Sequence, residues 1–328
     1  MNFLRKAIII GIAPIFLSFS AIAEIKVVTT IKPIHSLVSG VMDGVSNPTL
    51  IIEGSNNPHN FSLKPSHAKM LEEADIVFWI GEDLESFMEK PLSSLAKDAV
   101  KISFMDLPSI KKLKFREKNI FDDHDHDGHK DDDHDDHGHD DHDGHEDEHE
   151  GHDDHDGHNH GEFDAHIWLD PSNAIKMVLE ISHELSEADP DNAAKYEQNA
   201  DKMVASLKNL ISEVDSTISK DASFVVFHDA YQYFENRFGV SSAGALTLNP
   251  DVLPGAKQID AIQDLIQDDN IKCIFSEPQY NPKIIETLAA DMNISTGVMD
   301  PLGAFIDQGP EMYNQLILNI ANSLKDCS

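Results

Sequence analysis

The sequence of 328 residues is poor in basic residues and in cysteine. It has 25 lysines and arginines against 59 aspartates and glutamates, which gives a formal net charge of -34. A field of this sign repels phosphate backbones and anionic lipid surfaces, so nucleic acid is not expected as a partner and cations are favoured. Neither Cys273 nor Cys327 has a second cysteine or a histidine within two to four residues, which argues against a cysteine-based metal site.

Long apolar runs are also missing beyond the N-terminus. The first residues, MNFLRKAIIIGIAPIFLSFSAIA, combine a basic start, an apolar run and a small-residue end. This pattern predicts a secretory signal peptide over residues 1–23 that is cleaved near Ala23-Glu24. A retained membrane anchor is the alternative, but the run is short and Pro14 interrupts it. Export places the chain in an oxidising compartment, so we expect a disulfide between its two cysteines.

Short β-branched runs alternate with amphipathic stretches on both sides of residues 122–160. The alternation predicts βαβ units and therefore an α/β fold with parallel sheets. The strand-like segments are 25–30, 49–52, 75–80, 100–104, 223–227, 272–275 and 294–299. The helical segments between them are 35–41, 65–73, 256–268 and 282–292. A further helix is expected to begin at Pro171, with Asp170 as its N-cap.

Residues 190–220 carry apolar side chains at intervals of three and four, which predicts one amphipathic helix of about thirty residues, roughly 45 Å long. Such a helix is too long for the interior of one small domain. We therefore expect two pseudo-symmetric α/β lobes, 24–188 and 221–328, joined by a long helix at 189–220, with a ligand cleft between the lobes. The N-terminal lobe would contain a loop at about 119–162.

The segment from 122 to 160 is a repeat of histidine, acidic residues and glycine. It holds 19 carboxylates and one lysine, a charge of -18, so -16 remains for the rest of the chain. Without apolar residues to offset the entropy of ordering, this His-rich tract is expected to be disordered. Neutral imidazoles flanked by carboxylates bind Zn²⁺, Cu²⁺ or Ni²⁺, so the tract predicts many weak sites that collect and buffer divalent metal. Its thirteen histidines are His124, His126, His129, His134, His137, His139, His142, His145, His149, His152, His155, His158 and His160.

Three of the six remaining histidines are weaker candidates for a tight site. His67 and His183 fall in helical stretches among polar neighbours, and we expect both to lie on the surface. His35 lies near a strand-to-helix turn in IKPIHSLV that could face the cleft, where it would stand at the mouth or behind the metal ligands, but a place outside the cleft is the stronger expectation.

Each of the other three histidines lies at a strand or loop boundary, where α/β proteins present functional side chains. His59 follows a turn in GSNNPHNF, His166 lies in DAHIWLDP, and His228 follows the strand SFVVF. Three imidazole nitrogens and one carboxylate would complete a tetrahedral zinc site. Asp300 ends a strand of the second lobe in VMDPLG and is the candidate fourth ligand; the alternative is a turn or N-cap aspartate before Pro301.

Five segments of the sequence carry a specific family resemblance: PHNFSLKPS, ADIVFWIGEDLESFMEKPL, HIWLDP after the His-rich insertion, VFHDAYQYFENRFG and MDPLG. They resemble the zinc-binding, ZnuA-type members of the cluster A-I (family 9) metal solute-binding proteins. The resemblance covers essentially the whole mature chain. It implies two α/β lobes joined by a rigid backbone helix, with metal held between them. The ligands implied are His59, His166, His228 and a carboxylate at the position of Asp300, and the two cysteines would be paired.

The resemblance also implies a function. The chain would be a periplasmic protein, monomeric and not an enzyme, that captures Zn²⁺ with high affinity and delivers it to an ABC permease in the inner membrane. A histidine at position 228, where manganese-type relatives tend to carry glutamate, favours zinc. Some zinc-binding members have a glutamate ligand directly before the first histidine, where this sequence has Pro58, so Asp300 or a water is favoured as the fourth ligand.

Three alternatives remain open. The chain could carry Mn²⁺ or Fe²⁺ within the same family, or it could be an exported metal buffer in which the His-rich tract does the binding. An exported zinc hydrolase is disfavoured, because the sequence has no HExxH helix and no evident general base beside the three histidines.

Overall fold

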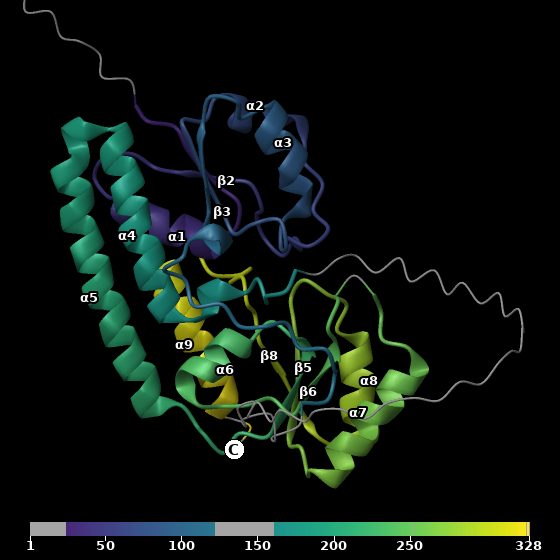
Figure 1. Cartoon of the computed structure of the whole chain (residues 1–328). Coiled ribbons are helices and arrows are strands. Elements are labelled where there is room, and N and C mark those ends of the chain that lie inside the picture. Colours follow the sequence, from purple (N-terminus) through teal and green to yellow (C-terminus); the bar gives the residue numbers. More distant parts are fainter. Residues whose placement is uncertain (1–23, 122–160, 251, 326, 328) are drawn as a thin grey trace, which may run out of the picture.

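Two parallel β-sheets of four strands each form the two halves of the molecule, one above the other in Figure 1. The computed structural model describes residues 24–121, 161–250, 252–325 and 327. The expected signal peptide and the thirteen histidines of the His-rich tract lie outside the described residues. The strand orders are β2-β1-β3-β4 and β6-β5-β7-β8, so the two sheets have the same arrangement. The two-lobed α/β fold expected from the sequence is confirmed.

The first lobe is built on a sheet whose central strands are buried along their whole length, as expected when helices cover both faces. Its strands are β1 (Val27–Thr29), β2 (Thr49–Leu50), β3 (Ile76–Trp79) and β4 (Val100–Ser103). Its helices are α1 (Lys32–Val41), α2 (Pro65–Glu72) and α3 (Glu89–Ser94). The sequence reading did not predict α3, because six residues are too few to show a helical period.

The second lobe repeats this plan. Its strands are β5 (Phe224–His228), β6 (Gly244–Thr247), β7 (Cys273–Ser276) and β8 (Ser295–Val298). Its helices are α6 (Gln232–Phe238), α7 (Ala256–Asp268), α8 (Lys283–Met292) and α9 (Met312–Lys325). Strand β6 and helices α6 and α9 were not predicted. β6 is short and begins with Gly244. A Cβ atom at this position would lie 2.6 Å from the backbone oxygen of Asn119, so the close approach of the two chain segments requires glycine.

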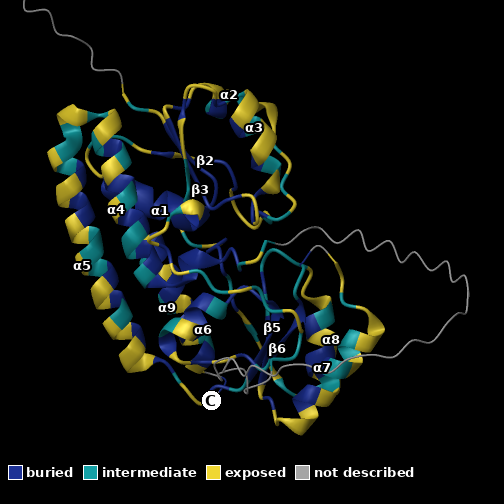
Figure 2. Cartoon of the chain, in the orientation of Figure 1, coloured by how far each residue is buried: buried dark blue, intermediate teal, exposed yellow. Residues whose placement is uncertain are grey.

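Two long helices run beside both sheets (Figure 1). Helix α4 (Pro171–Ala188) starts with Pro171 after the N-cap Asp170, as predicted, and packs along α5 (Ala193–Thr217). A 3-10 turn at Pro190–Asn192 precedes α5. The predicted long helix is therefore confirmed, with a length of 25 residues, or about 38 Å. In Figure 2 its inner side is buried and its outer side is exposed, as its amphipathic pattern requires.

A segment of the first half of the chain, residues 111–121, lies on the second lobe, and we call it the strap. The backbone N–H of Phe121 donates to the oxygen of Ala243 at 2.9 Å, and the N–H of Ala245 donates to the oxygen of Asn119 at 2.8 Å. The chain thus crosses to the second lobe before the His-rich tract begins, and this crossing covers the β6 edge of the second sheet. The lobe boundaries expected from the sequence remain a prediction.

The end of the chain also crosses between lobes. The buried ammonium group of Lys32 in α1 donates to the backbone oxygens of Gly303 at 2.6 Å and Ile306 at 2.5 Å. Ser36 Oγ, one turn along α1, donates to the oxygen of Gly309 at 2.7 Å. Helix α9 then packs against α1 and α5. The loop after β8 is therefore fixed to the first lobe.

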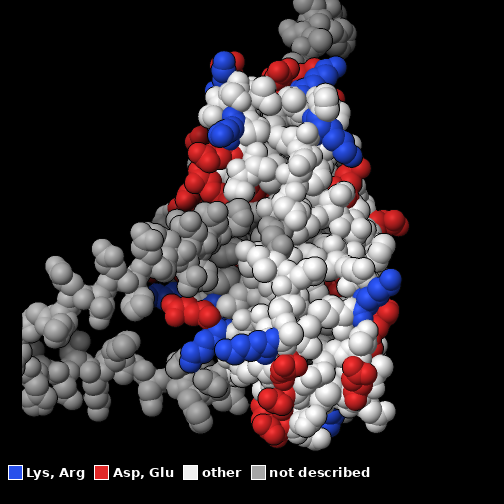
Figure 3. Space-filling model, turned by 90° about the vertical axis from the view of Figure 1, so that its right-hand side faces the viewer, with Lys and Arg blue, Asp and Glu red and all other residues white. Residues whose placement is uncertain are grey.

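Cys273, at the start of β7, forms a disulfide with Cys327, which follows α9, as the sequence predicted. In the described part of the chain, the helices are too short or too polar to cross a membrane. On the face shown in Figure 3, acidic and basic side chains are interspersed among uncharged ones. A large share of the formal net charge, -18 of -34, belongs instead to residues 122–160.

Candidate metal centre

His166 is held by a buried carboxylate two residues before it. Asp164, which is 2% exposed, accepts a hydrogen bond from the backbone N–H of His166 at 2.9 Å. The same oxygen, Oδ1, lies 2.7 Å from His166 Nδ1. Because a carboxylate only accepts, Nδ1 carries the hydrogen and Nε2 presents a lone pair to the space in front of the ring. The imidazole is thus oriented as a metal ligand.

His228 is held in the same way from a neighbouring strand. It is the last residue of β5, and Glu277 directly follows β7, which pairs with β5. The carboxyl ends of parallel strands meet at one edge of the sheet, where α/β proteins place their ligand sites. Glu277 Oε1 lies 2.8 Å from His228 Nδ1, and Glu277 is 3% exposed. The Nε2 atom of His228 is therefore also left as a donor of a lone pair to a metal.

His59 comes from the first lobe. It lies in the loop between β2 and α2, and its backbone N–H donates to Oδ1 of Asn57 at 3.0 Å. Its ring centroid is 5.5 Å from that of His166 and 5.9 Å from that of His228. His59 is half-buried, whereas the other two histidines are buried. The three rings thus come from segments on both sides of the space between the lobes.

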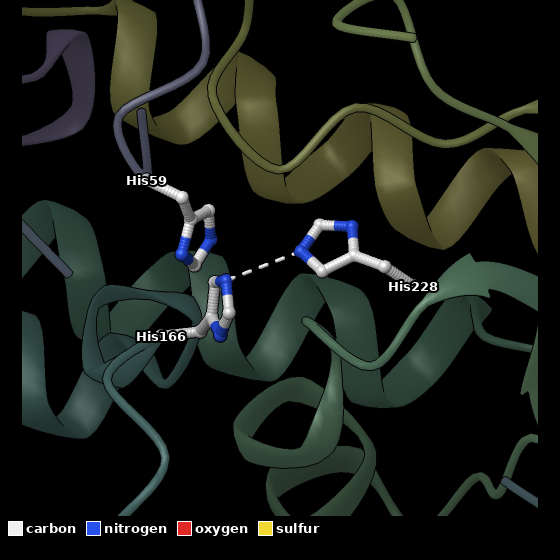
Figure 4. Close-up of side chains that lie close together, drawn as sticks. All are labelled: His59, His166 and His228. Atoms are coloured by element: carbon white, nitrogen blue, oxygen red, sulfur yellow. Dashed lines mark hydrogen bonds between the residues drawn. The ribbon is translucent and has the colours of Figure 1, made fainter. Parts of the chain in front are cut away.

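The three imidazoles converge on one point (Figure 4). One ring nitrogen from each lies within 4.8 Å of the others, and the Nε2 atoms of His166 and His228 are 3.3 Å apart. Two nitrogens that bind the same zinc ion at about 2.0–2.1 Å in a tetrahedral arrangement are about 3.3–3.4 Å apart. The spacing of His166 and His228 therefore fits a tetrahedral metal, and His59 supplies a third corner.

The charge around the rings favours a divalent cation. The Nδ1 atoms of His166 and His228 both donate to carboxylates, so in neutral rings the two Nε2 atoms face each other with their lone pairs. Two lone pairs repel each other, and the contact becomes favourable only when a proton or a cation lies between them. Asp164 and Glu277 add two buried negative charges directly behind the rings. A divalent cation in front of the rings would balance both charges.

Two further buried carboxylates have a cation of their own. Arg116, in the strap, lies 2.8 Å from Oδ1 of Asp229 and 2.7 Å from Oε2 of Glu235. Asp229 directly follows His228 in the sequence. Burial raises the pKa of Asp229 to about 7, although Arg116 beside it opposes the shift. Arg116 thus pairs with Asp229 and Glu235. The carboxylates of Asp164 and Glu277 contact the two imidazoles instead and would face a bound metal through them.

The cavity between the rings is small. Its volume is about 10 Å³, enough for one water-sized or ion-sized occupant and far below the volume of a small-molecule site. Such a cavity does not favour a hydrolase, which needs room for a substrate beside its metal. The lining residues are Asn57, Pro58, His59, His166, Trp168, His228, Glu277, Gln279, Tyr280, Pro301 and Leu302.

Comparisons with known proteins show the family to which the chain belongs. A family model described as "Zinc-uptake complex component A periplasmic" (ZnuA) matches residues 27–327. The chain belongs to this family. It is 48% identical over 303 residues to the "High-affinity zinc uptake system protein ZnuA" of Brucella abortus (strain 2308), covering 92% of this chain and 91% of that protein.

A relative with the same name from Yersinia pestis is 32% identical over 310 residues and covers 93% of this chain and 92% of its own. A solved structure titled "Crystal structure of ZnuA" superposes with a TM-score of 0.70 at 19% identity, over 92% of this chain and 98% of that one, and shows the same fold. The family resemblance read from the sequence motifs is therefore confirmed.

Asp300 does not belong to the three-histidine cluster, although its partners Gln279 and Leu302 line the cavity between the rings. Its Oδ1 accepts hydrogen bonds from Gln279 Nε2 at 2.9 Å and from the backbone N–H of Leu302 at 3.0 Å, and its Oδ2 accepts one from the N–H of Ala304 at 2.6 Å. These are the contacts of a turn aspartate before a proline, the alternative reading of this residue. Among the described residues, the group whose ligand atoms lie within 4.8 Å of one another consists of His59, His166 and His228, and Asp300 is not part of it. The role of Asp300 as fourth ligand remains a prediction.

The other described histidines take different positions from one another. His183 is exposed on α4 beside Glu187, as predicted. His35 is buried in α1, where its Nε2 lies 3.3 Å from the oxygen of Pro48, and it does not line the cavity. The alternative in which His35 faces the cleft is therefore not realised, because its helix turns that side toward the connection to β2. His67 is 8% exposed, so its expected surface position is also wrong.

The sequence reading missed Asp164 and Glu277. The sequence holds a weak signal for both. Asp164 lies two residues before a predicted ligand, and Glu277 lies two residues after the end of the predicted strand KCIF. The candidate ligands themselves are predicted from positions of this kind, at the ends of strands. What the sequence could not show is that these two, among 59 acidic residues, are buried and in contact with imidazoles.

Replacing either orienting carboxylate should weaken metal binding without removing a ligand. We expect Asp164→Asn and Glu277→Gln each to lower the affinity for Zn²⁺ by about 10- to 100-fold, because an amide holds the imidazole less firmly and removes a balancing charge. The affinity is measured by competition with a zinc chelator. Glu187→Gln, on the exposed face of α4, is the matched control and should bind as the wild type does. Equal affinities in all four proteins would contradict the orienting role.

Proposed function

We propose that this chain is the periplasmic zinc-binding protein of an ATP-driven importer, which captures Zn²⁺ and delivers it to a membrane permease. The observation that carries the proposal is the convergence of His59, His166 and His228, with the Nε2 atoms of the last two 3.3 Å apart. The expected signal peptide places the chain outside the cytoplasm. Membership of a family described as zinc-uptake and periplasmic, with relatives named as high-affinity zinc uptake proteins, supports the proposal.

The ligand set favours zinc over manganese or iron(II). Three neutral imidazoles suit a borderline ion such as Zn²⁺, whereas Mn²⁺ prefers oxygen ligands. The tight spacing of the nitrogens fits a four-coordinate ion, and the small cavity leaves little room for additional waters. A water or Asp300 would take the fourth position.

The arrangement of the ligands suggests how binding is signalled. His59 belongs to a loop of the first lobe, whereas His228 ends a strand of the second lobe, so a bound metal adds a contact between the lobes. A ligand that contacts both lobes stabilises the arrangement in which its donors meet. The loaded protein would therefore differ from the empty one at the rim of the cleft, and a permease that binds this rim could distinguish the two forms.

The His-rich tract would collect zinc beside this site. Its two ends are described: the strap ends at Phe121, and the chain resumes at Gly161, five residues before His166. Backbone contacts join the ends, because Phe115 N–H donates to the oxygen of Glu162 at 3.2 Å. A tether of this kind keeps weakly bound ions at high local concentration near the tight site. The tract would raise the rate of capture when zinc is scarce and would not set the affinity.

Deletion of residues 122–160 should leave one tight site. We expect the wild type to bind several zinc ions, one tightly and the rest weakly, and the deleted chain to bind a single ion with the same tight affinity. Calorimetric titration gives both stoichiometry and affinity, and competition with Mn²⁺ gives selectivity. Adding His166→Ala to the deleted chain should abolish tight binding. If the deletion itself removes tight binding, the chain is a metal buffer; if Mn²⁺ displaces Zn²⁺ at equal concentration, it carries manganese.

Delivery is tested in cells that lack this chain. In medium with a zinc chelator, we expect the wild-type chain to restore growth and zinc accumulation, and His166→Ala/His228→Ala to fail although it is exported. His183→Ala, which alters an exposed histidine of α4, is the control and should restore growth. Full rescue by the double variant would contradict delivery from the three-histidine site.

A further inference from the structure

The loop that carries His59 contains no strand or regular helix. It runs from Ile51 to Lys64, between the end of β2 and the start of α2. His166 and His228 are held by a following helix and by a strand, and each has a carboxylate behind its ring. His59 lies within this loop, so the contacts that fix the loop contribute to the position of its ring. At its N-terminal end the loop is joined to the end of β1 by backbone hydrogen bonds of Ile51 and Ile52. At its C-terminal end it is joined to α2 by contacts of a side chain, that of His67.

His67 links that end of the loop to α2. It is the third residue of the helix, and its Nδ1 accepts a hydrogen bond from the backbone N–H of Lys64 at 3.2 Å. In return, the backbone N–H of His67 donates to the oxygen of Lys64 at 2.9 Å. The bond from the Lys64 N–H to the His67 ring is the half of a capping box that a glutamate or glutamine at the third helical position usually supplies, and the other bond is an ordinary backbone bond of the first turn. It fixes the last residue of the loop to the first turn of α2.

The His67 ring also fixes the loop nearer to the ligand. It stacks on the ring of Phe61, with centroids 5.6 Å apart and planes inclined by 28°. Phe61 lies two residues after His59 and also contacts the ring of Phe87, at 5.4 Å between centroids. Phe87 lies in a 3-10 turn of the body of the first lobe. His67 thus contacts the loop at residue 61 and at residue 64.

The surroundings keep the His67 ring neutral. Burial lowers its pKa, the nearby ammonium group of Lys64 acts in the same direction, and the carboxylate of Glu53 opposes both. A neutral imidazole whose Nδ1 accepts a hydrogen bond carries its hydrogen on Nε2. A histidine that appeared from the sequence to be a surface residue therefore has a defined acceptor role inside the first lobe.

We propose that His67 is a positioning residue for the metal ligand His59, and that it acts through the backbone N–H of Lys64 and the ring of Phe61. The inference rests on the proposed function, because it concerns the same metal site. His67 does not belong to the cluster of nitrogens within 4.8 Å and would not touch the metal. Without it, the loop would sample positions in which the His59 ring points away from the other two. The apparent affinity falls in proportion to the fraction of molecules that hold the competent position.

The test uses the full-length chain. His67→Leu removes the acceptor and the aromatic ring, and we expect it to weaken Zn²⁺ binding about tenfold, as typical supporting residues do. His67→Gln keeps an acceptor at the capping position and should recover a large part of the loss. Phe61→Leu removes the stacking partner only and should weaken binding about threefold. His183→Leu alters an exposed histidine of α4 and should change nothing.

Two measurements separate positioning from a general effect on stability. Zinc affinity is measured by chelator competition at less than one equivalent of metal, where the tight site fills first. The visible spectrum of the protein with half an equivalent of Co²⁺ reports the ligands directly, and we expect His67→Leu to shift the wild-type bands. Lower melting temperatures in both His67→Leu and Phe61→Leu with unchanged affinity and spectrum would overturn the proposal. Failure of the wild type to bind one zinc ion tightly would overturn the proposed function instead.

Discussion

The structure of the site depends on two buried imidazole–carboxylate contacts, His166 with Asp164 and His228 with Glu277. Each carboxylate takes the hydrogen of one ring nitrogen and turns the other nitrogen toward the centre. The result is a pair of Nε2 atoms held 3.3 Å apart in a cavity too small for more than one ion-sized occupant. Two lone pairs and two buried negative charges at such short range are stabilised by one divalent cation. A metal bound here would therefore find two of its candidate ligands already oriented.

The fold keeps these contacts in place from several directions. The indole N–H of Trp168, two residues after His166, donates to the oxygen of Pro301 at 2.8 Å. Arg237 of α6 binds both carboxylate oxygens of Asp170, the N-cap of the helix that follows His166, at 2.6 and 2.9 Å. Arg116 of the strap binds Asp229, directly after His228. His166 and His228 are therefore each supported by contacts of the residues next to them, and His59 approaches from a loop of the first lobe.

The sequence predicted the parts of this arrangement that depend on local pattern. Seven of the strands and the long helix have clear periodicity, and His59, His166 and His228 could be selected because each lies at the end of a strand or turn. Strand β6 begins with a glycine, and the six-residue helix α3 is too short to show a helical period. The roles of Asp164, Glu277 and His67 depend on burial by residues distant in the sequence, which one sequence does not encode locally. His67 has polar neighbours along the chain, yet its ring is buried and stacks on Phe61, which in turn contacts Phe87.

The central claim is that three imidazoles from separate segments bind one zinc ion. X-ray absorption at the zinc edge tests it most directly, with one equivalent of Zn²⁺ bound to the chain that lacks residues 122–160. The account predicts a four-coordinate ion with three histidine nitrogens at about 2.0–2.1 Å and one oxygen. A first shell with fewer than three imidazoles, or a six-coordinate shell of oxygens, would contradict it.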